Sequence, residues 1–407
     1  MSDPIESPPS RSEELAPEDR RPDLVARATG VGAGLGQALL MPALALLVAL
    51  VVGVFVIALT DLDAWAVINT DPAGGLGQML EGVWVAYRAL FVGAFGSINA
   101  LSETLFAATP LMLAGLAVAL GFRAGLFNIG ANGQMLIGGM AGMWVGLHIS
   151  LPAGLHIPLA LVAAVLGGAA WAGIAGLLKA RTGAHEVITT IMLNFVALFL
   201  VRFLLKTPVF QEVGRASPLS EKLPPSAQFP AIFGSDYRVT IGLFIAFAAV
   251  IFVNWLLFRS SLGFEFRAVG LNPSASRYAG MNVAWLYVGV MAISGGLAGI
   301  AGANQVMGLP PYQVTPGFSG IIGFDAIALA LLGRSHPVGV LWAALLFGAL
   351  KAGGRSMQAA AQIPIELVVV IQALIIVFIA APELVRAIFR VRRAEKEPAQ
   401  LTKGWAE

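Results

Sequence analysis

The sequence predicts an all-α polytopic membrane protein with about ten transmembrane helices. Of its 407 residues, 57% are hydrophobic and only 12% are charged, and the mean hydropathy is +0.81. Soluble domains carry roughly 25% charged residues. Apolar runs of about 18–22 residues recur along the chain, and each is long enough to cross roughly 30 Å of hydrocarbon. Because an unsatisfied backbone group is costly in lipid, each run is expected to be an α-helix.

Ten apolar runs account for the pattern. They lie near residues 38–59, 104–121, 131–149, 157–178, 187–205, 239–258, 285–306, 320–333, 335–350 and 363–382. The eighth is short and rich in glycine, so we expect a broken or re-entrant helix there. The stretch 82–100 is ambiguous, but Arg88, Gly93 and Gly96 favour an interfacial segment over an eleventh span. A weak similarity between the two halves predicts a possible internal repeat, as in many transporter folds.

The distribution of Lys and Arg predicts that both termini lie in the cytoplasm, because most basic residues then fall on the inner side. Residues 1–37 are expected to be a disordered, acidic cytoplasmic tail. Residues 383–407 are expected to be a basic cytoplasmic tail, and 38–382 the transmembrane domain. The outer loops are then 60–103 and 206–238, and the segment 259–284 faces the cytoplasm. The first apolar run is too long for a signal peptide, so it is interpreted as an uncleaved anchor.

Small residues recur at helical spacing within several runs. Gly138, Gly142 and Gly146 are spaced by four, as are Gly295 and Gly299. Such spacing places the glycines on one face of a helix, where they let another helix approach closely. We therefore expect these positions at helix–helix contacts.

The polar stretch 263–280 between two apolar runs is predicted to be a small capped helix. Asn272 suits the N-cap, Pro273 the first helical position, and Gly280 a left-handed turn that ends the helix. Arg277 is expected to face a partner and Tyr278 to pack back onto the spans. A preformed helix on the cytoplasmic face indicates a contact with another protein.

Several kinds of chemistry are missing from the sequence. No Gly-Lys pair occurs, so the chain has no Walker A loop and is not itself a P-loop ATPase. There is no cysteine, and the four histidines are scattered among different loops. No metal site, bound cofactor, nucleophile or nucleic-acid partner is predicted, and the chain is not expected to be an enzyme.

Polar side chains at membrane depth are usually functional, and the densest group lies in the stretch 125–139. Asn128, Asn132 and Gln134 stand there at the start of the third span, among glycines. Two interpretations stay open: the amides cap helix ends and bind loops, or they take part in gating a pathway.

Three further polar residues are candidates for a pathway. Glu186 and Asn194 lie on the fifth span, where Asn194 either lines the pathway or bonds to another helix. Asp325 lies in the middle of 320–333 and needs a hydrogen-bond partner, a helix N-terminus or water, so helix capping is an alternative role. The set of Asn, Gln, Thr and Asp side chains suits a polar, neutral solute.

Four motifs carry a family resemblance. They are GLFNIGANGQMLIGG, HEVITTIMLN, GFEFRAVGLNPSASRYAGMNV and GFDAIALALLGRSHPVG, in this order. Together they resemble the permease subunits of bacterial ABC importers, within the branch for nucleosides and simple sugars. The ribose-type and branched-chain amino-acid permeases are related to this branch. The resemblance covers about residues 100–382.

The resemblance implies a function and a set of partners. The chain would be the permease subunit of an ATP-driven importer that works by alternating access, and 38–382 would be its permease domain. A separate ATPase would bind ATP and Mg, a second permease subunit (by family habit a paralogue) would complete the pathway, and an extracytoplasmic binding protein would deliver the solute. Membrane lipid would surround the chain in the bacterial plasma membrane.

The resemblance also assigns residues to two sites. The segment 263–283 would couple the chain to the ATPase, through Gly263, Arg267, Gly270, Asn272, Pro273, Arg277 and Gly280. The translocation pathway and its gate would include Asn128, Asn132, Gln134, Glu186, Asn194 and Asp325. The family often has an acid at the position of Asn132. The alternative function is an ion-coupled secondary transporter of a small polar solute, with Asp325 and Glu186 as ion carriers.

Overall fold

The computed structural model describes residues 43–212, 214, 217–234, 236–380 and 388–389. The predicted tail 1–37 and nearly all of 383–407 lie outside these residues. Within them the chain is helical, and its β-structure is limited to two isolated bridges, Gln211 with Ser220 and Ala231 with Thr240. The prediction of an all-α fold is confirmed for the described residues.

The helices follow one another with short connections, apart from the long segments between α7 and α8 and between α11 and α12. In chain order they are Ala43–Thr60, α2 Leu62–Ile68, α3 Pro72–Phe95, α4 Ile98–Arg123, α5 Ala131–His148, α6 Ala153–Thr182, α7 Glu186–Leu204, the 3-10 turn η1 Pro225–Ala227, α8 Gly242–Arg259, α9 Ser261–Leu271, α10 Pro273–Tyr278, α11 Val283–Met307, α12 Ile322–Leu332, α13 Pro337–Ala361 and α14 Ile365–Ala380.

Seven of the described helices are long and apolar enough to cross a membrane, which indicates a multi-pass membrane protein. The three other expected spans correspond to α5, α12 and α14. In α5, the polar Asn132 and Gln134 stand among several glycines. The helix α12 has only 11 residues, as expected for a broken or re-entrant helix, and α14 has 16. The full count of ten therefore stays a prediction.

Two predicted boundaries are wrong. The ninth span was expected to end near 350, but α13 continues to Ala361. Within this continuation Lys351 pairs with Asp325, and the exposed Arg355 pairs with Glu103. The predicted loop 60–103 contains α2, α3 and the start of α4. The helix α3 begins with Pro72 in its first turn and packs along α13. It is not among the seven candidate spans.

The core is built around α4. The helices α13, α11, α12 and α8 make the most extensive contacts with it, and its residues from Ala108 to Gly121 are all buried. The predicted helix–helix contacts are confirmed for Gly138, Gly142, Gly295 and Gly299, whereas Gly146 faces Leu223 of the segment 206–238. Gly295 faces the backbone of Gly168, and Gly299 faces Gly138 and the Ala164 carbonyl, so a β-carbon at either position would overlap the neighbouring helix. Close backbone contact of this kind is how helices pack in the absence of a hydrophobic driving force.

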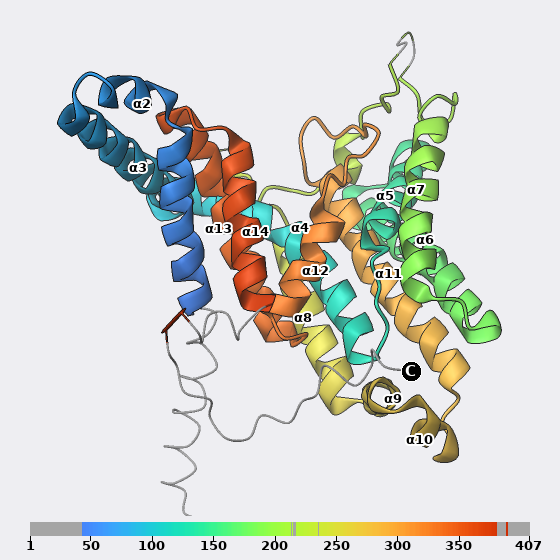
Figure 1. The fold of residues 1–407 in the computed structure, drawn as a ribbon. Coiled ribbons are helices and arrows are strands. Elements are labelled where there is room, and N and C mark those ends of the chain that lie inside the picture. Colours follow the sequence, from blue (N-terminus) through green and yellow to red (C-terminus); the bar gives the residue numbers. More distant parts are fainter. Residues whose placement is uncertain (1–42, 213, 215–216, 235, 381–387, 390–407) are drawn as a thin grey trace, which may run out of the picture.

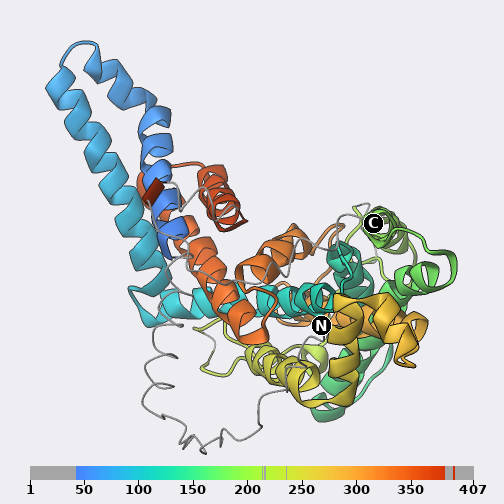
Figure 2. The same cartoon turned by 60° about the horizontal axis from the view of Figure 1, so that its bottom comes forward.

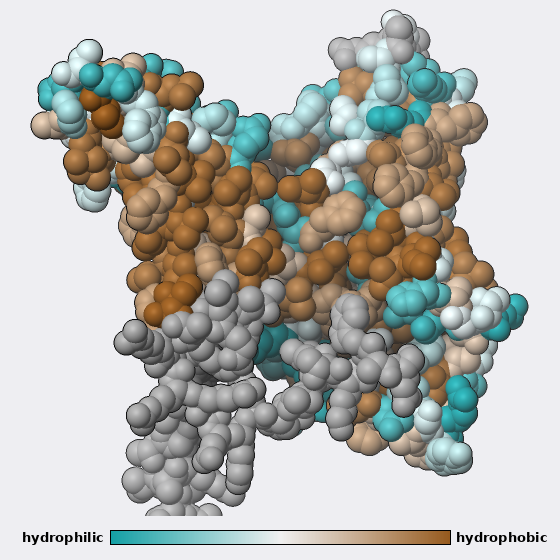
Figure 3. All heavy atoms as spheres, in the orientation of Figure 1, coloured by the Kyte–Doolittle hydropathy of each residue, from teal (hydrophilic) through white to brown (hydrophobic). Residues whose placement is uncertain are grey.

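The shape has two ends and one projecting arm. The hairpin formed by Ala43–Thr60, α2 and α3 packs against α13 and α14 at its base, and its tip at α2 projects beyond the other helices (Figures 1 and 2). Hydrophobic residues form a broad band across the face in view, with hydrophilic residues gathered above and below it (Figure 3). We call the end that carries α9 and α10 the α10 end, and the opposite end, which carries the segment 206–238, the loop end.

Candidate functional site

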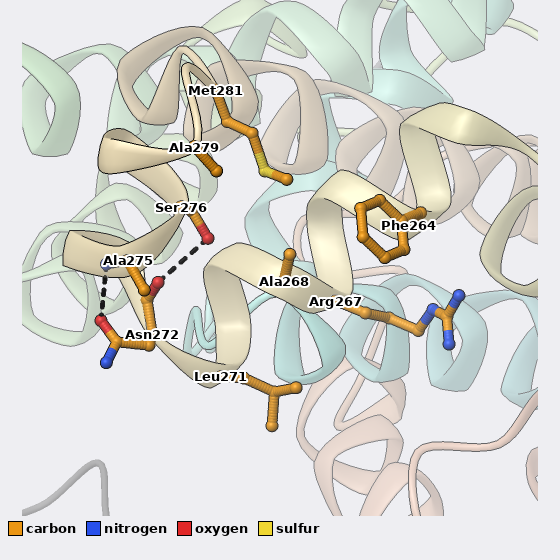
Figure 4. A pocket seen from close by; sticks show the side chains of 9 residues that line it. All are labelled: Phe264, Arg267, Ala268, Leu271, Asn272, Ala275, Ser276, Ala279 and Met281. Atoms are coloured by element: carbon orange, nitrogen blue, oxygen red, sulfur yellow. Dashed lines mark hydrogen bonds between the residues drawn. The ribbon is translucent and has the colours of Figure 1, made fainter.

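At the α10 end, two short helices join α8 to α11, where the sequence predicted only one. The helix α9 begins after Ser260, whose Oγ accepts a hydrogen bond from the Gly263 amide at 2.9 Å. The helix α10 agrees with the prediction. Asn272 Oδ1 accepts from the Ala275 amide at 2.9 Å (Figure 4), Pro273 is the first helical residue, and Gly280 has φ +85°.

The helix α9 is fixed to the body of the protein by its two glycines. A β-carbon at Gly263 would overlap the Leu256 carbonyl oxygen at the end of α8, and one at Gly270 would overlap the Arg123 carbonyl oxygen at the end of α4. Phe266 and Val269 are buried on the same helix. Gly263 and Gly270 were predicted as coupling residues, and the structure gives both a packing role.

In contrast, α10 packs mainly against α9 and makes little contact with the spans. Only Ser276 of its six residues is buried. The prediction that Tyr278 packs onto the spans is wrong, because the residue is 95% exposed. The short helix is held by its own caps, and the Tyr278 ring points away from the rest of the protein. Arg277 is exposed as well, as a contact with a partner requires.

Between α9 and α10 lies a groove of about 430 Å³. It is lined by small and apolar side chains with a polar fringe: Phe264, Arg267, Ala268, Leu271, Asn272, Ala275, Ser276, Ala279 and Met281 (Figure 4). The Arg267 side chain extends away from α10 in this view, and its guanidinium carbon lies 5.5 Å from the centroid of the Phe258 ring. Arg267 thus contacts the body of the protein, whereas the Arg277 side chain is exposed.

Two of the three predicted amides of the stretch 125–139, Asn128 and Gln134, form a hydrogen-bond network. Asn128 Nδ2 donates to Gln134 Oε1 at 3.0 Å and to Ser294 Oγ on α11 at 2.7 Å. Asn128 Oδ1 accepts from the Gly130 amide at 3.0 Å and from Gln134 Nε2 at 2.8 Å. Ser294 Oγ in turn donates to the Ala117 carbonyl on α4 at 2.6 Å. This geometry gives Asn128 and Gln134 the structural role that was one of the two alternatives, and a role in gating stays a prediction.

Asn194 belongs to the same region. Its Oδ1 accepts from the Gly133 amide at 2.8 Å and its Nδ2 donates to the Ile129 carbonyl at 2.9 Å, so it ties α7 to the start of α5. Asn132 differs from these amides. Its Oδ1 is buried with no hydrogen-bond partner within the described part of the chain, and its backbone packs against Gly323 at the start of α12.

The two predicted carboxylates each lie beside a lysine that sequence reasoning did not assign to the site. Glu186 Oε2 lies 2.8 Å from Lys179 Nζ. Asp325 Oδ2 accepts a hydrogen bond from Lys351 Nζ at 2.6 Å, between α12 and α13. Lys351 lies within a long apolar helix, and that position alone marks it as a charge in need of a partner.

At the loop end, a second charged group was also not predicted. Glu103 Oε2 lies 3.1 Å from Nη1 of both Arg238 and Arg355. These residues border a cavity of about 960 Å³ between α3, the start of α4 and the end of α13. The predicted pathway residues therefore form three groups. Asn128, Gln134 and Asn194 lie around the start of α5, Glu186 pairs with Lys179, and Asp325 on α12, whose start packs against Asn132, pairs with Lys351.

Asn128→Ala is expected to lower the free energy of unfolding by roughly 3 kcal/mol, because Gln134, Ser294 and the Gly130 amide lose a buried partner at once. Thermal unfolding of the purified variant in detergent measures the effect as a lower midpoint. Thr189→Ala is the matched control, since the Thr189 hydroxyl bonds only to His185 of its own helix, and it should stay close to the wild type. An unchanged midpoint for Asn128→Ala would contradict the structural role.

The chain is similar to permease proteins over most of its length. It shares 40% identity over 323 residues with the guanosine ABC transporter permease protein NupP of Bacillus subtilis, covering 79% of this chain and 93% of that protein. It shares 39% over 336 residues with the glucose ABC transporter permease protein TsgB13 of Haloferax volcanii, covering 78% and 87%. It shares 37% over 322 residues with the nucleoside ABC transporter permease protein NupB of Lactococcus lactis, covering 77% and 88%.

Each of these three organisms also has a second permease protein, named for the same solute, that is 28–33% identical to this chain. No solved structure gives a significant match. The family model described as branched-chain amino acid transport system / permease component matches residues 100–380, from the start of α4 to the end of α14. The chain therefore belongs to this family of ABC transporter permease subunits.

Proposed function

We propose that this chain is the membrane-spanning subunit of an ATP-driven importer for nucleosides or simple sugars, and that it couples to a separate ATPase through residues 263–283. The observation that carries the coupling is the contrast between two adjacent helices. The helix α9 is fixed to α4 and α8 by close glycine contacts, whereas α10 presents Arg277 and Tyr278 to the surroundings. A partner that binds α10 thereby acts directly on α9.

The proposed orientation places the α10 end in the cytoplasm. The last turns of α4, α6 and α8 carry Arg123, Lys179, Arg181 and Arg259, and basic residues are retained on the cytoplasmic side of membrane proteins. The loop end then faces outward, where an extracytoplasmic binding protein delivers the solute. The membrane is the plasma membrane, and its lipid contacts the hydrophobic band of Figure 3.

The solute class rests on the relatives and on the polar residues. The three relatives are named for guanosine, glucose and nucleosides. All of these solutes are polar and carry several hydroxyl groups, which amides bind well. Asn132 is the predicted residue best suited to bind such a solute, because its buried Oδ1 has no partner in the described structure and lies beside the start of α12.

A second permease subunit is proposed to complete the pathway, and we propose a paralogue rather than an identical copy. The support is that each of the three relatives has a more distant counterpart in its own organism. ATP and Mg bind to the ATPase in this proposal, and this chain holds no cofactor. ATP binding and hydrolysis displace α10 and α9, and the spans packed on α9 alternate between outward-open and inward-open arrangements.

The test is uptake of labelled guanosine or glucose by vesicles that contain this chain, its permease paralogue, the ATPase and the binding protein. Uptake should continue when the proton and sodium gradients are collapsed at constant internal ATP, and should stop when ATP is replaced by a non-hydrolysable analogue. Vesicles without the binding protein are the control. Uptake that stops with the ion gradient at constant ATP would establish the secondary transporter instead. The relatives favour the ATP-driven importer, and both proposed ion carriers lie beside a lysine.

A further inference from the structure

The aromatic ring of Phe258, at the end of α8, lies at the centre of a cationic group at the α10 end. The His336 ring stacks on it with centroids 5.0 Å apart. The guanidinium carbons of Arg123 and Arg267 lie 5.9 and 5.5 Å from the ring centroid. These side chains come from α4, α8, α9 and the residue before α13, so four separate segments meet at one ring.

The Arg123 guanidinium holds the connection between α12 and α13. Its Nε donates to the Ser335 carbonyl at 2.8 Å and its Nη2 to the Arg334 carbonyl at 3.2 Å. Arg334 and Ser335 have φ values of +52° and +51°, a backbone region that residues with a β-carbon rarely adopt. Hydrogen bonds from one planar side chain to both carbonyls stabilise this unusual turn.

The backbone of Arg123 contacts the other side of the group. Its carbonyl oxygen lies against Gly270 of α9, where a β-carbon would overlap it. The neighbouring Gly125 has φ +73° and also lies against Gly270. One residue thus touches α9 through its main chain and the α12–α13 turn through its side chain.

We propose that Arg123 is a positioning residue that transmits displacement of α9 to the α12–α13 turn. The inference rests on the proposed coupling of α10 to an ATPase, and it adds the route by which that displacement continues into the spans. Both α12 and α13 extend from this turn toward the Asp325–Lys351 ion pair that joins them. A movement of the turn would therefore reach two helices that this ion pair joins.

The imidazole of His336 in this group is uncharged. Burial, and secondly the nearby Arg123, lower the pKa of His336, which keeps the ring neutral at pH 7. The neutral ring lets Nδ1 accept a hydrogen bond from the Val338 amide at 3.3 Å at the first turn of α13. The neutral His336 ring therefore lies beside Phe258 together with the two cations Arg123 and Arg267.

The test uses the complete complex with Arg123→Ala, Arg123→Lys and the control Arg259→Ala. Arg259 is exposed on the same surface, next to Phe258, and forms no hydrogen bond or ion pair with any residue in the described ranges. Arg123→Ala should still co-purify with the ATPase, but solute imported per ATP hydrolysed should fall roughly tenfold, within the usual range of coupling between sites. Arg123→Lys should also lose most of the coupling, because lysine lacks the planar guanidinium whose fixed donors reach both carbonyls while its face lies near the Phe258 ring. Arg259→Ala should match the wild type.

A distance measurement separates transmission from mere folding. The chain contains no cysteine, so Leu262→Cys and Val338→Cys, at positions 39% and 42% exposed, can carry a spin-label pair between α9 and the start of α13. In the wild type the distance distribution should stay narrow with and without ATP, because the two segments move together. In Arg123→Lys, which retains the charge and the assembly, it should broaden when ATP is added.

The outcomes decide between the proposals. If Arg123→Ala does not assemble, Arg123→Lys carries the test alone. A narrow distribution and wild-type coupling in Arg123→Lys would overturn the role of Arg123. The proposed function is tested separately by replacing α10. If the ATPase still binds this variant and uptake is normal, the coupling surface is wrong, whatever the Arg123 variants show.

Discussion

Replacement of residues 272–280 by a Gly-Ser linker of the same length is expected to leave the chain inserted in the membrane and to abolish ATP-driven uptake. The linker preserves the connection from α9 to α11 but removes α10 and its exposed face. Because only Ser276 of α10 is buried, the spans lose little packing. Co-purification of the ATPase and uptake by reconstituted vesicles should both fall below detection.

Matched single substitutions refine this test. Asn272→Ala removes the N-cap of α10 at a cost of about 1 kcal/mol, a large effect for a helix of 6 residues, so uptake should fall in part. Asn282→Ala removes the equivalent cap of α11, whose amide hydrogen bond comes from Trp285. That helix has 25 residues and is held by packing, so uptake should be close to normal. Wild-type uptake with the linker would remove α10 from the coupling surface.

The sequence signals at the two ends of α10 were used in the prediction, whereas the signal for α9 was missed. Asn272, Pro273 and Gly280 specify the start and end of α10 within a few residues of sequence. The helix α9 has an N-cap at Ser260, but its position depends on Gly263 and Gly270 meeting the ends of α8 and α4, and no local pattern shows these contacts. Tyr278 was misplaced for a related reason. Helical spacing predicts which residues share a face of α10. The direction of that face relative to the spans depends on the turns at its ends, such as the one at Gly280, and spacing does not predict it.

Long-range contacts limited the prediction of the pathway residues. The sequence marks Asn128 and Asp325 as polar groups that need partners, and both have partners. Ser294 lies 166 residues from Asn128, and Lys351 lies on another helix, so no local pattern connects them. The ninth span was also predicted too short: it was expected near 335–350, whereas α13 continues through Lys351, which pairs with Asp325, to Ala361.

Lys351→Met is expected to destabilise the protein and to abolish uptake, because it leaves the Asp325 carboxylate without its partner. Loss of one member of a fully buried pair costs 3–5 kcal/mol. The side chains of Lys351 and Asp325 are 27% and 12% exposed, so we expect roughly 2 kcal/mol after screening by solvent. Thermal unfolding in detergent and uptake by reconstituted vesicles measure the two effects. Glu366→Gln is the control, because Glu366 is an exposed carboxylate on α14 and its loss should change neither.

The double variant Asp325→Asn with Lys351→Met decides what the pair contributes. Both charges disappear together, so the desolvation cost of an unpaired carboxylate disappears as well, and stability should return to within about 1 kcal/mol of the wild type. If the pair only joins α12 to α13, uptake should recover with stability. If Asp325 contacts the solute or carries an ion, uptake should stay lost although the protein is stable. We expect recovery, because the carboxylate already accepts a hydrogen bond from Lys351 at 2.6 Å and an ATP-driven importer needs no titrating group at this position.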